Sequence, residues 1–439
     1  MEGIVMTVQL LLGLSILVGL HELGHLLAAK AFGMRVEKYS IGFPPKIWGK
    51  QFGETEYSIG MIPLGGFVKI SGMIDESLDV KTLGAEPEPY EFRAKPAWQR
   101  LIVMMGGIIV NVITGIFIFV TLTFYQGETY MSIDEVNKNG IVAMELGEMI
   151  GLQTGDKIVG VNGEKIDRYG DIISGNVLLS DNGVYNVVRA GKEIDIPIPG
   201  DFIDHFSDKD DAPAFISPRF VLDIQEVPED GNAYQAGLRT GDQLVSVFGQ
   251  RITYFDELKS SLDTLSGKTL LANANRNGST IELEIPVTEE GTIGFVQNLD
   301  QFELSKVEYG LGESINLGTT KAFNVVWVNI KAFKKMFSGE VSARKSLSGP
   351  IGIAKFFGGT WDWAHFWHIT GLLSMVLAFM NFLPIPALDG GHVMFLTWEI
   401  VSGRKPSDKF LENAQKVGMI LLLGIMTFAI FNDIAKAWF

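Results

Sequence analysis

A hydrophobic run that ends in a metal-binding signature constrains this chain more than any other feature. The run covers residues 4–20, contains three polar side chains, and is closed by His21-Glu22-Leu23-Gly24-His25. At about 100° per residue, a helix places His21 and His25 on one face and brings Glu22 within reach of a water on the metal. An isolated charge near a bilayer centre costs about 2.5–3.5 kcal/mol, which favours a functional zinc site over a chance match.

A second apolar run supplies candidates for the third ligand that a catalytic zinc site needs. It starts near Ile369 and ends in Asn381-Phe382-Leu383-Pro384-Ile385-Pro386-Ala387-Leu388-Asp389-Gly390-Gly391-His392. One further hydrophobic stretch lies between the two runs, so both cross the bilayer in the same direction and their far ends lie at one depth. This topology brings Asp389 to the histidine pair. The alternative is that Asp389-Gly390-Gly391 is an ordinary turn at a helix end.

Four segments are apolar enough to span a bilayer: residues 4–29, 101–124, 368–388 and 417–431. The first is too long for a signal peptide, and Glu2 stands where such a peptide has a basic region. The chain has no cysteine, which excludes disulfides and cysteine ligands. These features predict a polytopic α-helical membrane protein with four spans.

Charge divides the chain into two parts. Residues 126–320 hold 14 Lys/Arg and 33 Asp/Glu, whereas the whole chain holds 36 and 51, so the acidity is confined to this block. Basic residues near the span ends in 30–100 and 404–416 place those loops in the cytoplasm by the positive-inside rule. The acidic block and both termini then lie outside the membrane, and the metal ligands lie toward the cytoplasmic side. Such acidity argues against a nucleic-acid partner.

The acidic block contains an internal repeat. Residues 151–166 align without gaps to residues 237–252, with nine of sixteen positions identical at a separation of 86. This spacing predicts two tandem domains of about 90 residues. The shared pattern is similar to PDZ domains of bacterial proteases, which capture peptides by adding a strand to a sheet edge. A purely steric role for both domains is the alternative.

Two further stretches carry weaker signals. Residues 56–70 alternate and read as a hairpin whose apolar tip, Met61-Ile62-Pro63-Leu64, dips into the membrane. Residues 315–337 read as an amphipathic helix on the membrane surface, with Lys321, Lys331, Lys334 and Lys335 interleaved. His365 and His368 follow among tryptophans typical of an interfacial belt, and we expect no ligand role for them because they lie at the opposite membrane face from Asp389. His392, three residues past Asp389, is also a possible ligand, although a supporting or capping role is expected for it.

The HExxH in the first span and the NxxPxxxLDGG in the third resemble the site-2 intramembrane metalloproteases, and most of all their bacterial members with two periplasmic PDZ domains. The resemblance implies a zinc ion held by His21, His25 and Asp389, with Glu22 as general base. It also implies that Asn381 contacts the substrate backbone. Residues 63–70 are similar to the family's membrane-entering β-loop, and residues 100–111 also match. One departure is Gly106-Gly107, where Gly-Pro is expected, which puts the local bend of span two in doubt.

A membrane-embedded helical substrate must unwind before water can attack its peptide bonds. An edge strand formed by Gly66, Phe67, Val68, Lys69 and Ile70, together with Asn381, is suited to hold the extended form. A plain surface hairpin is the alternative reading of this segment.

The expected order of segments is span one (1–30), a cytoplasmic loop with a membrane-associated β-hairpin (31–99), span two (100–125), two extracytoplasmic PDZ-like α+β domains (126–215 and 216–310), an amphipathic surface region (311–364), span three (365–389), a cytoplasmic loop (390–414) and span four (415–439). The expected function is a zinc endopeptidase of a bacterial inner membrane that cuts the transmembrane segment of a single-span protein. The resemblance suggests an anti-sigma factor already trimmed by another protease, or signal-peptide remnants. The competing readings are a membrane-anchored tandem-PDZ scaffold and a metal transporter.

Overall fold

The computed structural model describes residues 1–73, 86–207 and 215–438, and the chain forms two compact units. One unit comprises residues 1–127 and 308–439, and the other comprises residues 128–307. The first carries the apolar helices and the second carries most of the acidic block. Since residues 128–307 interrupt the first unit in sequence, that unit is assembled from both ends of the chain.

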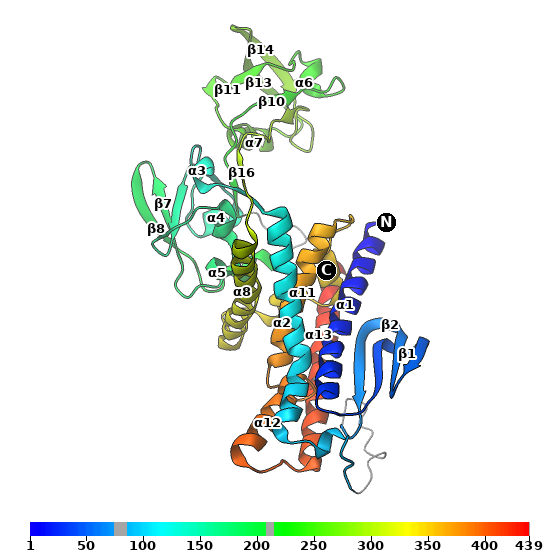
Figure 1. The fold of residues 1–439 in the computed structure, drawn as a ribbon. Coiled ribbons are helices and arrows are strands. Elements are labelled where there is room, and N and C mark those ends of the chain that lie inside the picture. Colours follow the sequence, from blue (N-terminus) through cyan, green and yellow to red (C-terminus); the bar gives the residue numbers. More distant parts are fainter. Residues whose placement is uncertain (74–85, 208–214, 439) are drawn as a thin grey trace. The chain divides into compact units, whose positions relative to one another are not determined.

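The first unit contains four helices that are long and apolar enough to cross a membrane, which confirms the predicted number of spans for the part of the chain that is described. They are α1 (Glu2–Ala31), α2 (Ala97–Gln126), α11 (Trp363–Phe382) and α13 (Asp408–Trp438). Helices α1 and α11 both pack against α2, so α2 is the central helix of the three (Figure 1). The helix α2 is continuous through Gly106 and Gly107, without the bend that a proline would produce.

The third span ends earlier than expected. Helix α11 ends at Phe382, whereas the span was predicted to continue to Asp389. Pro384 and Pro386 explain the difference, because proline disfavours helical backbone in the residue before it and donates no hydrogen bond. A new helix, α12 (Asp389–Ser402), then begins at Asp389, within the region expected to be a loop (390–414). Asp389-Gly390-Gly391 therefore starts a helix and does not end one.

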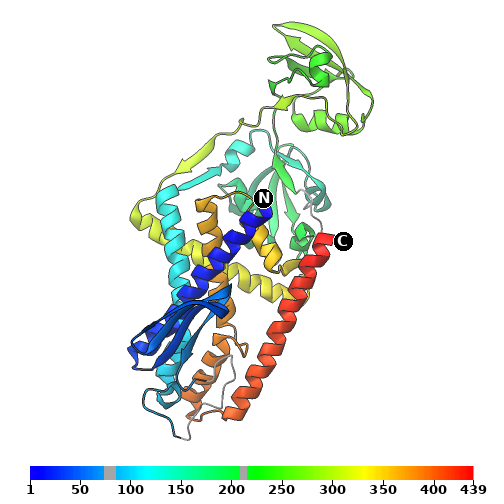
Figure 2. The same ribbon diagram turned by 90° about the vertical axis from the view of Figure 1, so that its right-hand side faces the viewer.

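The hairpin before span two is also built differently from the expectation. Strand β1 (Val36–Phe52) and strand β2 (Thr55–Ile70) are joined at Gly53, whose φ of 62° suits a tight turn. The expected tip at residues 61–64 instead lies inside β2. Residues 38–41 pair on one side with residues 66–69 and on the other with residues 56–59. Residues 66–69 therefore form an edge of this sheet, which lies beside α1 (Figure 2).

Three further helices complete the first unit: α8 (Leu311–Ser338), α9 (Ala343–Ser346) and α10 (Pro350–Phe356), with the short 3-10 turn η2 (Phe92–Ala94) before α2. Helix α8 packs against α2 at Gly318, where a Cβ atom would come within 2.5 Å of the Val120 nitrogen. The carboxylate of Asp433, near the end of α13, accepts hydrogen bonds from the backbone N–H groups of Gly349, Ile351 and Gly352 at the start of α10. The region between the second unit and span three is thereby tied to span four.

The second unit contains two four-stranded sheets with the same strand order, β6-β5-β7-β8 and β12-β11-β13-β14. The first consists of β5 (Lys157–Val161), β6 (Glu164–Lys165), β7 (Val184–Arg189) and β8 (Lys192–Pro197). The second consists of β11 (Gln243–Val247), β12 (Gln250–Arg251), β13 (Thr269–Arg276) and β14 (Ser279–Pro286). Each sheet packs over its own apolar core. The sequence repeat thus corresponds to a repeated fold.

The remaining elements of this unit are short. The helices are α3 (Ile133–Val136), α4 (Glu145–Met149), α5 (Gly175–Leu178), α6 (Asn232–Gln235) and α7 (Phe255–Asp263), with 3-10 turns η3 (Tyr169–Ile173) and η4 (Phe202–Ser207). The paired strands are β4 (Ile141–Ala143) with β9 (Ile216–Pro218), β10 (Ile224–Glu226) with β15 (Val296–Gln297), and β3 (Glu128–Met131) with β16 (Leu304–Val307). The last pair joins the two ends of the unit.

The two Thr-Gly-Asp turns that mark the repeat make the same contacts in each domain. Asp156 binds the Arg189 guanidinium through both carboxylate oxygens, at 2.7 Å each, and Asp242 binds Arg276 at 2.7 and 2.6 Å. Each turn also fixes its neighbouring strand through the threonine hydroxyl, which accepts from a backbone N–H. The repeated motif is therefore a fold determinant that attaches the turn to the last residue of the third strand.

Candidate metal centre and active site

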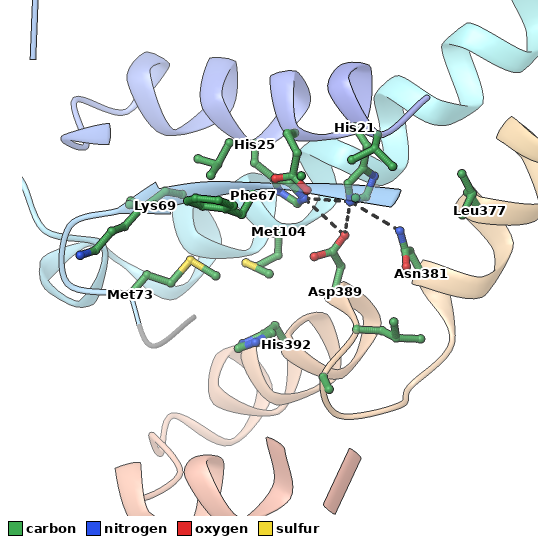
Figure 3. Close-up of a pocket in the computed structure, with 18 of the residues that line it drawn as sticks. His21, His25, Phe67, Lys69, Met73, Met104, Leu377, Asn381, Asp389 and His392 are labelled. Carbon is green, nitrogen blue, oxygen red and sulfur yellow. Dashed lines mark hydrogen bonds and ion pairs between the residues drawn. The ribbon is translucent and has the colours of Figure 1, made fainter. Parts of the chain in front are cut away.

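Three predicted ligands from opposite ends of the chain meet in the first unit. His21 and His25 project from α1, and Asp389 lies at the first position of α12. Asp389 Oδ2 lies 3.1 Å from His21 Nε2 and 3.4 Å from His25 Nε2, and the two Nε2 atoms lie 3.2 Å apart (Figure 3). Among the described residues this is the group of histidine and acidic side chains whose ligand atoms converge for a metal.

The donor set fits zinc. Ligand atoms about 2.0–2.1 Å from a tetrahedral zinc lie roughly 3.3 Å from each other, which matches the three distances. Asp389 Oδ2 is buried and has no hydrogen-bond partner among the described residues. This oxygen faces two histidine nitrogens but makes no hydrogen bond with them, and a buried polar atom in this state calls for a further partner such as a metal ion. His25 Nδ1 lies 2.8 Å from the Val103 carbonyl oxygen and must donate to it. His25 Nε2 then keeps its lone pair for a metal.

The predicted base lies between this cluster and the sheet edge. Glu22 lines the same cavity as the three ligands, and its carboxylate accepts a hydrogen bond from the backbone N–H of Val68. Gly66 is close as well, because a Cβ atom there would lie 3.3 Å from Glu22 Cγ and 2.7 Å from the Ser40 carbonyl oxygen. Absence of a side chain at residue 66 thus lets the edge strand approach the carboxylate.

All predicted site residues line one cavity of about 710 Å³. It is bounded by α1, the edge of β2, the end of α11 and the start of α12 (Figure 3). The lining includes each residue of the predicted edge segment, 66–70, and Asn381, whose Nδ2 lies 3.5 Å from His21 Nε2. The cavity therefore brings together a metal-binding cluster, a carboxylate and an exposed strand edge.

Span two contributes groups to this site for which the sequence analysis gave no role. Asn111 is fully buried, and its Nδ2 lies 3.2 Å from His21 Nδ1. A Cβ atom on Gly107 would come within 2.5 Å of both His21 Cε1 and His25 Nε2. A Cβ atom on Gly24 would lie 2.2 Å from the Gly106 carbonyl oxygen, so α1 and α2 cross at these glycines. The unexpected Gly106-Gly107 pair thus lies where the two histidine rings leave no space for a side chain. The pair of glycines was the only signal of this close approach in the sequence.

The other histidines of the site region have different surroundings. His392 lines the cavity and its Nε2 lies 3.1 Å from the Gln415 side-chain nitrogen of α13. His365 Nε2 lies 2.6 Å from the Phe356 carbonyl oxygen, and His368 lines a separate cavity of about 350 Å³ with Lys321 and Thr123. None of the three belongs to the group whose ligand atoms converge.

Comparison with known proteins gives the family. The sequence profile of "Peptidase family M50" matches residues 9–425, nearly the whole chain. The chain belongs to peptidase family M50. This M50 peptidase is 30% identical over 457 residues to a "Putative zinc metalloprotease" of Vibrio cholerae, with 98% of each chain covered. It is 30% identical over 458 residues to "Regulator of sigma-E protease RseP" of Escherichia coli, with 97% of each covered. A "Regulator of sigma E protease" of Haemophilus influenzae is 29% identical over 451 residues, with 97% of this chain and 98% of that protein covered.

The resemblance to site-2 proteases is therefore confirmed, and so is the expected enzyme class. This M50 peptidase is a membrane-embedded zinc metalloprotease of the site-2 type. Zinc is its metal, and the His21, His25 and Asp389 cluster offers nitrogen and oxygen ligands at suitable distances.

Proposed function

We propose that this M50 peptidase cuts the transmembrane segment of a single-span protein, with zinc held by His21, His25 and Asp389 and with Glu22 as general base. The observation that carries the proposal is the single cavity in which these four residues meet the free edge of β2. A metal-binding scaffold or transporter has no need of a strand edge beside a carboxylate. A peptidase needs both, because its substrate must be held extended next to the base.

The residues of the chain have separate tasks in this reaction. When bound, zinc polarises the scissile carbonyl and makes water a good nucleophile near neutral pH. Glu22 takes a proton from the attacking water and passes it to the leaving amine. The Val68 N–H on the edge strand donates to Glu22, which places the proposed base beside the strand edge where an added strand would pair. Asn381, whose Nδ2 lies 3.5 Å from His21 Nε2, is suited to hold the substrate backbone.

The proposed substrate is a pre-trimmed anti-sigma factor in the bacterial inner membrane, with signal-peptide remnants as a further class. The support is the names of the relatives, several of which are regulator of sigma-E proteases. The basic loops between the spans support a cytoplasmic side for the site and an extracytoplasmic side for residues 128–307. Strong acidity of that unit is compatible with a location away from the anionic cytoplasmic leaflet.

We further propose that the two repeated domains are PDZ-like and act as a size filter for substrates. Their matching strand order, matching Thr-Gly-Asp turns and acidic composition support a duplicated soluble module. Short edge strands such as β15 (Val296–Gln297) offer positions for an added peptide strand, so peptide binding is the second candidate role.

A reconstituted cleavage assay tests the proposal. Purified full-length protein is incubated in proteoliposomes with a trimmed single-span substrate, with zinc, with a zinc chelator, and with the Glu22→Gln variant in place of the wild type. We expect zinc-dependent cleavage, mapped by mass spectrometry to a bond inside the transmembrane segment. A product cut outside that segment, or zinc binding with no cleavage of any single-span substrate, contradicts the proposal and favours a scaffold or transporter.

A further inference from the structure

One face of α2 holds the histidine pair. Val103, Gly107 and Asn111 follow one another at intervals of four residues, so they form a stripe along the helix. The Val103 carbonyl meets His25 Nδ1, Gly107 leaves space for both rings, and the Asn111 amide meets His21 Nδ1. We propose that Asn111 is a positioning residue that sets the His21 tautomer required for zinc. The inference rests on the proposed role of His21 as a ligand.

The Asn111 side chain is half satisfied as it stands. Its residue is fully buried, its Nδ2 faces His21 Nδ1 at 3.2 Å, and its Oδ1 has no hydrogen-bond partner among the described residues. The backbone around it is fixed, because the Ser374 hydroxyl of α11 donates to the Asn111 carbonyl oxygen at 2.7 Å. A buried polar atom without a partner costs about 1–3 kcal/mol, so the free Oδ1 calls for a function.

The chemistry of imidazole supplies that function. With Nδ2 directed at Nδ1, the amide donates to the ring, and the ring proton resides on Nε2, which faces Asp389 Oδ2 at 3.1 Å. Zinc needs the Nε2 lone pair, so the proton must then be on Nδ1, where it requires an acceptor. Half a turn of the amide presents Oδ1 to that proton. Since amide oxygen and nitrogen are nearly equal in size, the same pocket accommodates both orientations.

The two histidines are therefore held by different means. His25 donates to a backbone carbonyl, which can only accept, so its tautomer is fixed with or without metal. His21 depends on a side chain that can reverse its polarity. Asn381 cannot replace Asn111, because it lies on the Nε2 side of the ring, 3.5 Å from the atom that faces the metal. A substitution can remove the Asn111 side chain that contacts His21, but it cannot remove the Val103 backbone carbonyl that contacts His25.

Zinc affinity of the full-length protein, measured by competition with a chromophoric chelator, tests the inference. Asn111→Leu fills a similar space but offers no acceptor, and we expect about 10–100-fold weaker zinc binding, the usual effect of losing such a partner. Asn111→Asp restores an acceptor for Nδ1–H, and we expect affinity within about threefold of wild type. The control is Thr123→Val, which removes another buried polar group of α2 that accepts a hydrogen bond from Lys321 and lies outside the cavity of the proposed metal ligands.

The outcomes separate this inference from the proposed function. Wild-type affinity in Asn111→Leu overturns the positioning role, and so does an Asn111→Asp variant as weak as Asn111→Leu. Thermal unfolding of the metal-free variants shows whether a loss is mere misfolding, since Asn111→Leu should melt no earlier than Thr123→Val. A His21→Ala variant is measured alongside. If it keeps full affinity, the proposed ligand set is wrong, whereas loss in His21→Ala without loss in Asn111→Leu leaves that set intact and contradicts only the role of Asn111.

Discussion

At the scale of single residues, the proposed metal ligands and the proposed base have different neighbours. His21, His25 and Asp389 have converging ligand atoms, whereas Glu22 is bound to the Val68 N–H at the strand edge. The proposed base is therefore held by the element that we propose to bind the substrate. Loss of a ligand and loss of the base should consequently have different effects on zinc content.

Glu22→Gln should retain zinc and lose cleavage. The amide preserves the size of the side chain, and its oxygen can still accept the hydrogen bond from the Val68 N–H. It cannot take a proton from water. We expect at least about a 100-fold lower cleavage rate, the usual contribution of a general base. Zinc content and cleavage rate are measured on the same preparation. Cleavage near the wild-type rate would rule out the general-base role.

Asp389→Ala should lower zinc occupancy, while His392→Ala and His365→Ala should leave it largely unchanged. Asp389 Oδ2 is the third converging ligand atom, whereas His392 faces Gln415 and His365 faces a backbone carbonyl. Elemental analysis of the three purified variants gives the answer. Zinc lost in His392→Ala but kept in Asp389→Ala would mean that the third ligand is His392.

At the scale of elements, the crossing of α1 and α2 determines where the histidine rings can lie. Gly107→Ala places a methyl group within 2.5 Å of both rings, which must then move. We expect weaker zinc binding in a protein that still folds. Gly115→Ala is the matched control on the same helix, since its methyl group meets the flexible Met375 side chain instead. Zinc affinity is measured for both, and equal affinities would show that the rings have spare room.

The turn before β11 is a second element whose chemistry can be tested. The Arg276 guanidinium holds the pKa of Asp242 below its usual range through a two-bond ion pair. Asp242→Asn should therefore destabilise the second repeat by roughly 1–3 kcal/mol, a range that allows for the partly exposed Arg276.

The pH dependence of this effect has a definite sign. A lowered folded-state pKa gives stability that is fully present above about pH 4, near the pKa of an unfolded aspartate, and that is lost as pH falls through the folded-state value. Wild type and Asp242→Asn should thus converge in acid. Hydrogen exchange of β11 and β13 amides, corrected for intrinsic pH dependence, measures the difference. Asp230→Asn, at an exposed position, is the control. A stability difference between wild type and Asp242→Asn that stays constant as the pH is lowered contradicts the ion-pair explanation.

Local spacing made part of this architecture predictable. His21 and His25 are one helical turn apart, and counting apolar runs brought Asp389 to the same depth, so the cluster followed from sequence. Asn111 did not, because a buried asparagine has no periodic signal and its partner lies 90 residues away. The hairpin turn was misplaced for a similar reason: the expected tip at residues 61–64 lies within β2, and long-range pairing across the sheet places the turn at Gly53.

At the scale of the whole molecule, residues 128–307 are an insertion whose ends adjoin. Glu128 pairs with Val307 in the β3–β16 ribbon, so the two ends of the inserted unit are adjacent. Joining Gly127 directly to Glu308 therefore removes the unit and leaves only a short distance to close. The ligand cluster belongs wholly to the other unit. We therefore expect the proposed zinc site and the proposed size filter to be separable by deletion.

Deletion of residues 128–307 should leave zinc binding and hydrolysis of a short substrate intact, and should allow an untrimmed substrate with a bulky external domain to be cut. The measurement compares cleavage of that untrimmed substrate by the full-length and deleted proteins in the same membranes. If the deleted protein still requires prior trimming, exclusion is imposed elsewhere and the repeated domains are better understood as peptide-binding modules.

The division of the proposed ligand set between the two ends of the chain also governs the order of biosynthesis. Asn381 follows His21 by 360 residues, and Asp389 comes later still. The ribosome therefore releases α1, α2 and the whole inserted unit before the third ligand exists. A growing chain that has not yet reached Asp389 lacks one of the three proposed zinc ligands. With the proposed ligand set, catalytic competence requires synthesis to have passed Asp389.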